Sequence, residues 1–174
     1  MLKLTGAFVA AALALFAPVS AAQAVAGPDA AYCETGEGPA LLVRVEGFKA
    51  YRGMLRIQVY GSDPSQFVKG GERVRRIDLP VAKSGPMSVC VKLPHEGNYA
   101  VAVRHDVDGD GKGGINDGGG FSRNPKISLG DALSRRMPKY QQVVINAGRS
   151  VRPIDVVLNY RQGLSIKPIA MASR

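Results

Sequence analysis

Histidine and cysteine are scarce in this chain, and the common catalytic motifs are absent from it. Its 174 residues include two histidines and two cysteines, which is too few to assemble a four-ligand zinc site easily. The sequence has no G-x-S-x-G, no H-E-x-x-H and no glycine-rich phosphate loop that leads into a helix. Hydrolases, zinc peptidases and nucleotide-binding enzymes use these spacings, so we expect a protein that is not an enzyme.

One enzymatic arrangement stays open as the least favoured alternative. A hydrolase would recruit His105 and Asp106, with Ser122 as the nucleophile. Neighbouring residues of a strand face opposite sides of the sheet, so His105 and Asp106 would pair only if the strand breaks between them. We expect His105 to anchor a loop or a sheet edge instead.

Long hydrophobic runs are confined to the start of the chain. Lys3, the apolar run from Ala7 to Ala17 and the small residues from Ser20 to Ala24 are typical of a secretory signal. We therefore expect residues 1–24 to be a signal peptide. No later run approaches the roughly 18 apolar residues that a membrane-spanning helix needs. The sequence predicts a periplasmic or secreted protein that does not span the membrane.

Acidic residues are outnumbered by basic ones. The chain has 14 Asp and Glu against 23 Lys and Arg, a formal net charge of +9. Such a surface favours anionic partners, here envelope lipids, lipopolysaccharide or acidic polysaccharide. We do not expect nucleic acid, because the protein is predicted to be exported and its basic residues are scattered. A solvated face that aids solubility is the alternative interpretation. The densest clusters are Arg73, Arg75 and Arg76, and Arg135, Arg136 and Lys139.

The two cysteines, Cys33 and Cys90, both lie beyond the expected signal. In an oxidising compartment an even count of two favours one disulfide. It would attach an irregular N-terminal arm to a strand, and closing a loop of this size contributes about 4 kcal/mol in the chain-entropy model. The alternative is a reactive thiol, but we expect neither a histidine nor a helix start near either cysteine.

Apolar and polar residues alternate with period two along most of the remaining chain, which is typical of half-buried strands. Short strands separated by Gly, Pro, Asn and Asp turns predict an all-β fold. We expect a single antiparallel β-sandwich, immunoglobulin-like or transthyretin-like, of about seven strands. The expected strands cover residues 41–46, 54–60, 73–82, 87–93, 97–105, 142–147 and 153–160.

The roughly 150 residues beyond the signal are enough for one domain. We expect an N-terminal arm over residues 25–39, the sandwich over residues 40–162 and a basic C-terminal tail over residues 163–174. Ser128 with Asp131 resembles a capped helix start. It predicts a short helical turn that ends before Pro138.

Acidic side chains recur at fixed spacing in the loop that begins at Asp106. The spacing follows the calcium loop D-x-[DN]-x-[DN]-G-x5-E over twelve residues, with Gly111 at the sharp turn. The expected ligands are the carboxylates of Asp106, Asp108, Asp110 and Asp117 and the main-chain carbonyl of Lys112.

The closing position of this loop is Asp instead of Glu, and no amphipathic helix precedes the loop. We therefore expect an isolated, weak calcium site, with a Kd of roughly 10⁻⁴ to 10⁻³ M as in extracellular modules. The alternative is that Asp and Gly, which favour turns, build a hydrated loop without metal. The residues expected to brace the loop are His105, Gly111, Phe121 and Asn124.

Three segments carry a resemblance to a known family. They are Tyr99-Ala100-Val101-Ala102-Val103-Arg104-His105-Asp106, the Asp/Gly-rich loop after it, and Gly120-Phe121-Ser122-Arg123-Asn124-Pro125. The chain from residue 42 to residue 160 resembles the exported bacterial proteins grouped as domain of unknown function 2141. A stretch of the form Gly-x-Pro-x-Glu-Gly-Tyr in that family is shortened here to Asp117-Gly118-Gly119. The resemblance implies a small β-sandwich and supplies no activity.

These patterns predict an exported binding or structural protein of the cell envelope with a calcium-binding acidic loop. The alternative is a metal-free interaction module whose basic surface binds anionic envelope components. The two hypotheses differ in whether binding depends on a metal ion.

Overall fold

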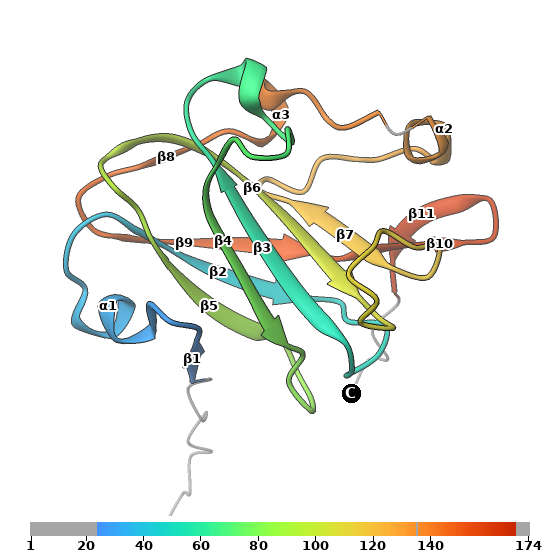
Figure 1. Cartoon of the computed structure of the whole chain (residues 1–174), viewed down its shortest axis with the longest axis horizontal. Coiled ribbons are helices and arrows are strands. Elements are labelled where there is room, and N and C mark those ends of the chain that lie inside the picture. Colours follow the sequence, from blue (N-terminus) through green and yellow to red (C-terminus); the bar gives the residue numbers. More distant parts are fainter. Residues whose placement is uncertain (1–23, 135, 170–174) are drawn as a thin grey trace, which may run out of the picture.

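The computed structural model describes residues 24–134 and 136–169, and in this part of the chain two β-sheets pack face to face (Figure 1). The predicted all-β sandwich is confirmed. Residues 1–23 of the expected signal peptide and Arg135 of a basic cluster lie outside the described residues. No helix in the described ranges has the length and apolar character needed to cross a membrane.

The first sheet consists of β1 (Val25–Ala26), β5 (Met87–Lys92), β2 (Ala40–Glu46) and β9 (Val151–Val157), in that order. The second sheet runs in the order β11 (Ser165–Pro168), β10 (Asn159–Gln162), β7 (Gly118–Phe121), β6 (Gly97–Asp106), β3 (Met54–Tyr60) and β4 (Arg73–Pro80), and β8 (Ile145–Ala147) pairs with β6. The helical elements are α1 (Ala30–Thr35), η1 (Pro64–Gln66), α2 (Leu129–Leu133) and α3 (Tyr140–Val143).

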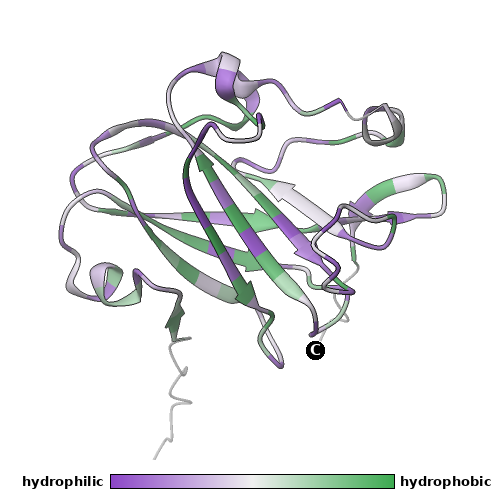
Figure 2. Cartoon of the chain, viewed as in Figure 1, coloured by the Kyte–Doolittle hydropathy of each residue, from purple (hydrophilic) through white to green (hydrophobic). Residues whose placement is uncertain are grey.

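The main core lies between the two sheets, where apolar residues alternate along the strands (Figure 2). Burying one such side chain contributes about 1.5–3 kcal/mol relative to leaving it exposed. The alternation read from the sequence therefore identifies the inner faces. The buried residues of two facing strands are Leu41, Val43 and Val45 of β2 and Leu55, Ile57 and Val59 of β3.

A second, smaller core covers part of the outer face of the second sheet. Tyr60, Phe67 and Phe121 pack there with Tyr140 and Val143 of α3. Phe67 makes edge contacts with the rings of Tyr60 and Phe121, at centroid distances of 5.5 and 6.1 Å. This cluster holds α3 and the segment around Phe67 on the sheet.

Two strand pairs are parallel, β1 with β5 and β2 with β9. The other pairs are antiparallel. The chain crosses from the second sheet before it forms β9, so β9 enters beside β2 in the same direction. Alternation indicates which face of a strand is buried, but it does not indicate whether the neighbouring strand is parallel or antiparallel.

The strand expected over residues 142–147 is wrong in its first half. Residues 140–143 form α3, and only 145–147 form β8. The helix is favoured because Gln142 Oε1 accepts the Lys139 N–H at 2.8 Å, which caps its start. Tyr140 and Val143 are then buried one helical turn apart. The helical turn expected after Ser128 is present as α2, where Ser128 Oγ accepts the Asp131 N–H at 3.1 Å.

The strand expected over residues 153–160 is two strands in different sheets, β9 and β10. Leu158 lies between them, fully buried, and its N–H donates to the Glu46 carbonyl at 3.0 Å. The alternating pattern continues through this corner, so the sequence does not reveal it. Residues 165–168 of the expected C-terminal tail form β11, which pairs with β10 as a hairpin.

The predicted disulfide between Cys33 and Cys90 is confirmed. Cys33 lies in α1, so a helix stands closer to this cysteine than expected. Cys90 is fully buried although it faces away from the main core, because α1 lies against β5. The Asp29 carboxylate adds a second attachment, since it accepts hydrogen bonds from the Arg75 guanidinium at 2.7 Å and the Lys92 N–H at 3.0 Å.

Candidate functional site

The acidic loop connects β6 to β7 as a long hairpin connection. His105 pairs with Gly118 across the two strands, so residues 107–117 project beyond the end of the sheet. Asp106 is the last residue of β6, and Asp117 immediately precedes β7. The two ends of the predicted motif are therefore fixed by the sheet itself.

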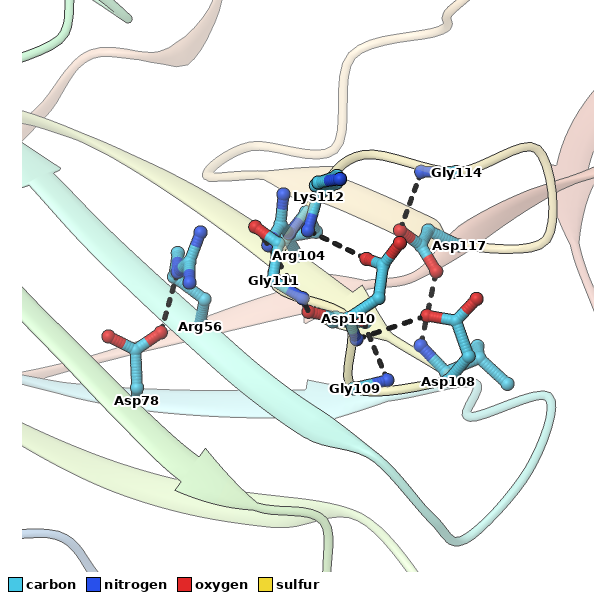
Figure 3. Close-up of polar contacts among 12 residues, drawn as sticks. Arg56, Asp78, Arg104, Asp108, Gly109, Asp110, Gly111, Lys112, Gly114 and Asp117 are labelled. Atoms are coloured by element: carbon cyan, nitrogen blue, oxygen red, sulfur yellow. Dashed lines mark hydrogen bonds and ion pairs between the residues drawn. The ribbon is translucent and has the colours of Figure 1, made fainter.

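Three of the predicted ligands come together in this loop. Asp106, Asp108 and Asp117 each offer a carboxylate oxygen, and these oxygens all lie within 4.8 Å of one another. Figure 3 shows two of the three, Asp108 and Asp117. Two oxygens on opposite sides of a calcium ion are about 4.6–5.2 Å apart, because each bond is about 2.3–2.6 Å long. The spacing of the three carboxylates suits one ion of that size.

Asp110 is not among these three carboxylates. Its Oδ1 accepts the Lys112 N–H at 2.7 Å, which closes a local turn, and the side chain is exposed. This bond accounts for the Lys112 N–H. The use of the Lys112 carbonyl as a ligand stays a prediction.

Backbone N–H groups hold the clustered carboxylates in place. Asp106 accepts from the N–H groups of Gly109 and Gly111, both at 2.9 Å. Asp117 accepts from the N–H groups of Val107 at 3.1 Å and Gly114 at 2.8 Å. These bonds shape the loop without a metal, as the alternative interpretation of the Asp-Gly pairs expects. They also fix the positions of the carboxylates.

The glycines of the loop are required by its backbone. Gly109 and Gly111 have φ of +74° and +78°, in the left-handed region that glycine enters without strain. Gly53, in the connection between β2 and β3, has φ of +78°, and a Cβ there would collide with the Asp106 carbonyl. Nothing near Gly53 in the chain indicates that it backs the acidic loop, so this role cannot be predicted from the sequence.

Asp106 is the most buried member of the cluster, at 2 % exposure. Burial alone raises the pKa of its carboxyl. The hydrogen bonds from the N–H groups of Gly111 and Gly109 and the charge of Arg104 lower the pKa, and together they outweigh burial. The pKa of Asp106 therefore lies below its usual value, and the group is an anion at neutral pH. Arg104 Nη2 reaches Asp106 Oδ2 at 3.3 Å and the Gly111 carbonyl at 2.9 Å.

His105 is fully buried beneath the loop. Its Nε2 lies 2.8 Å from the Arg52 carbonyl, which only accepts, so Nε2 carries the proton. Its Nδ1 then accepts from the Tyr160 hydroxyl at 2.6 Å, and that hydroxyl accepts the Lys49 N–H at 3.2 Å. Burial lowers the pKa of His105, although its bond to the Arg52 carbonyl acts in the opposite direction. His105 thus ties β6 and β10 to the β2–β3 connection.

Ser122 lies at the far end of β7 from His105. His105 pairs with Gly118, whereas the Ser122 N–H donates to the Val101 carbonyl. The Ser122 hydroxyl is buried, donates to the Val143 carbonyl at 2.5 Å and accepts the Val101 N–H at 3.0 Å. The structure therefore separates the histidine and serine that a hydrolase would have to bring together.

The other two bracing residues hold the far end of β7. Phe121 belongs to the second core. Asn124, with φ of +47°, donates from Nδ2 to the Asp155 carbonyl at 3.0 Å and accepts the Val157 N–H on Oδ1 at 2.8 Å. Asn124 connects the end of β7 to β9 of the other sheet, and its contacts are with β9 instead of the acidic loop.

A groove of about 610 Å³ lies beside the acidic loop, on the outer face of the second sheet. Ala102 and Arg104 of β6 and Gly119 of β7 line it, and Ile115 of the acidic loop lines it from one side. The one signal of this groove in the sequence is Ile115, a large apolar residue in an otherwise polar loop. Its side chain is 65 % exposed.

The protein is an all-β sandwich. A carboxylate cluster lies at the end of its second sheet, and a groove lies beside this cluster on the outer face of the same sheet. Residues 43–155 match the model of a protein family described as "Uncharacterized protein conserved in bacteria (DUF2141)", and the chain belongs to this family. The matched segment includes the whole acidic loop. Searches of curated proteins and of solved structures returned no match.

Proposed function

We propose that this protein is an exported binding module of the cell envelope whose acidic loop binds one calcium ion. The observation that supports the proposal is the convergence of Asp106, Asp108 and Asp117 within 4.8 Å. All three donors are carboxylate oxygens, the ligand type that calcium prefers, and an exposed loop leaves room for water to complete six to eight ligands.

The position of the cluster gives the ion a structural effect. Asp106 ends β6 and Asp117 precedes β7, so one ion would join the two ends of the hairpin connection. Binding would stiffen the loop that carries Ile115 along the edge of the groove. The disulfide supports an oxidising compartment, and weak calcium sites are typical of modules outside the cytosol.

Two neighbouring aspartates provide a matched test of the calcium site. Asp108 and Asp110 lie in the same loop, and each accepts one backbone N–H two residues ahead, at 3.3 and 2.7 Å. Only Asp108 belongs to the cluster. Asp108→Asn and Asp110→Asn therefore remove the same charge and preserve the same turn.

Calorimetric titration of chelator-treated protein with calcium should separate these variants. We expect Asp108→Asn to raise the Kd about tenfold or more, and Asp110→Asn to raise it about twofold through the loss of one nearby charge. Thermal melting should follow the same order, because bound calcium stabilises the folded state. No binding by the unaltered protein at millimolar calcium, or equal Kd values for the two variants, would contradict the proposal.

A second candidate function is metal-free binding of anionic envelope components. The arginines along the groove favour it. Its described lining residues include one carboxylate, Asp117, and four arginines, which are Arg73, Arg104, Arg136 and Arg161. Salt-sensitive binding to anionic vesicles or lipopolysaccharide that is indifferent to chelator would support it. Binding that requires calcium would count against it.

A further inference from the structure

We propose that the groove on the outer face of the second sheet binds one long-chain fatty acid, with its carboxylate beside the arginines and its chain along the apolar wall. The inference rests on the second candidate function and names its site and ligand class. It does not require calcium.

The size and the lining of the groove suit a single acyl chain. Its volume of about 610 Å³ falls within the roughly 300–1,000 Å³ that is common for small-molecule sites. Ile115 and Met137 line it and are 65 % and 54 % exposed. A contiguous exposed apolar surface is a feature of binding sites, and both side chains border the same groove. Val68, Ile127 and Ile166 extend this apolar lining.

The charge around the groove indicates an acidic head group. Arg73 comes from β4, Arg104 from β6 and Arg161 from β10, and Arg136, between α2 and α3, is a fourth cation of the lining. Arg104 Nη2 is already bonded to Asp106 Oδ2 and the Gly111 carbonyl, so the head group would lie nearer the other arginines of the groove. A guanidinium binds a carboxylate strongly through parallel N–H groups.

The glycines of β7 differ in the space that surrounds them. A Cβ on Gly118 would collide with the Tyr160 ring, and a Cβ on Gly120 would lie 2.7 Å from the Val157 carbonyl. Gly119 differs from both, because a Cβ there would meet only the Val103 carbonyl at 3.7 Å and its φ is not left-handed. The sandwich therefore tolerates a side chain at Gly119, and the groove would be filled by it.

This asymmetry supplies the blocking variant and its control. Gly119→Val places a side chain suited to a strand in the floor of the groove. Gly148 also has open space around it and no left-handed φ, and it does not line the groove. Gly148→Val is the matched control. Ala102→Leu, at a half-buried position that lines the groove, is a second blocking variant if Gly119→Val melts far below the unaltered protein.

The experiment measures displacement of a fluorescent fatty acid by palmitate in the purified protein with chelator present. We expect one palmitate per chain, at least a roughly tenfold loss of affinity in Gly119→Val and Ala102→Leu, and no change in Gly148→Val. The double variant Arg73→Gln/Arg161→Gln should weaken binding of palmitate and leave binding of hexadecanol unchanged.

Several outcomes would overturn the inference. Failure of the unaltered protein to bind monomeric palmitate would do so, as would unchanged affinity in both blocking variants. Salt-sensitive binding to anionic vesicles by an unaltered protein that does not bind palmitate would overturn the groove site and leave the second candidate function standing. An unaltered protein that binds neither palmitate nor anionic vesicles would contradict both the groove site and the second candidate function.

Discussion

Arg104 Nη2 lies 3.3 Å from Asp106 Oδ2, so one guanidinium joins the lining of the groove to the most buried carboxylate of the acidic cluster. Arg104 and Asp106 stand two residues apart on β6 and therefore face the same side of the sheet. An ion bound at Asp106 would meet the positive charge of Arg104. Calcium and this arginine should consequently compete for one carboxylate.

The first prediction follows from this competition. Arg104→Gln should lower the calcium Kd about fivefold, because roughly 1 kcal/mol of repulsion between like charges is removed. Arg161→Gln is the control, since Arg161 lines the same groove but donates to the Gly163 carbonyl. Calorimetric titration at low salt measures both variants. A Kd in Arg104→Gln equal to or higher than that of the control would show that the arginine does not oppose the ion.

The second prediction concerns mild acid. Burial lowers the pKa of His105 below the ordinary value of 6.5. The unfolded chain therefore binds a proton at a pH where the folded chain does not, and the free energy of unfolding should fall as the pH drops from about 7 toward 5. Urea unfolding in chelator at several pH values checks this.

His105→Gln isolates the buried histidine from the other titrating groups. It should be less stable than the unaltered protein at pH 7 and show a smaller fall in stability between pH 7 and 5. His95→Gln changes the exposed histidine and should keep the full fall. An unaltered pH dependence in His105→Gln would assign the effect to another group.

The third prediction concerns the hydroxyl that supports this histidine. Tyr160→Phe should lower the free energy of unfolding by about 1–3 kcal/mol, because His105 Nδ1 loses its donor inside the protein. Burial raises the pKa of Tyr160 to about 12. Since the unfolded tyrosine ionises near 10, the unaltered protein should lose stability between about pH 10 and 12, and the variant should lose less.

Urea unfolding at neutral and alkaline pH measures this effect. Tyr51→Phe, at a residue that is 49 % exposed, is the control and should change stability little. If Tyr160→Phe is as stable as that control, the hydrogen bonds that join Lys49, Tyr160 and His105 do not stabilise the fold.

The fourth prediction concerns the disulfide. Cys33 and Cys90 are separated by 57 residues, and losing the bridge should cost about 4 kcal/mol in the chain-entropy model. Thermal melting with and without a reducing agent measures the change. A Cys33→Ala/Cys90→Ala variant should melt like the reduced protein and be insensitive to the reducing agent. Equal melting of the oxidised and reduced protein would indicate that β1 and the Asp29 contacts hold α1 without the bridge.

The sequence predicts the parts of this fold that depend on local chemistry. Alternation identifies β2, β3 and the other long strands, because each has one inner and one outer face. The disulfide follows from the cysteine count and the expected compartment. The acidic loop follows from spacing alone, and its ends at Asp106 and Asp117 do converge.

The sequence does not reveal features that depend on distant partners. Leu158 continues the alternating pattern although the chain changes sheets there. Glycine is required at positions 118 and 120 of β7. Tyr160 and Val157, far along the chain, occupy the space that a side chain would need there. Asp110 has the spacing of a ligand, yet its carboxylate lies outside the cluster formed by Asp106, Asp108 and Asp117. The groove forms only when β10, β7, β6, β3 and β4 lie side by side in the second sheet.

A crystal structure of the protein in millimolar calcium, with an anomalous difference map, would test the calcium site itself. We expect one peak that lies about 2.4 Å from carboxylate oxygens of Asp106, Asp108 and Asp117. A map without a peak in this loop at that calcium concentration, or with a peak held by Asp110 and not by these three residues, would contradict it.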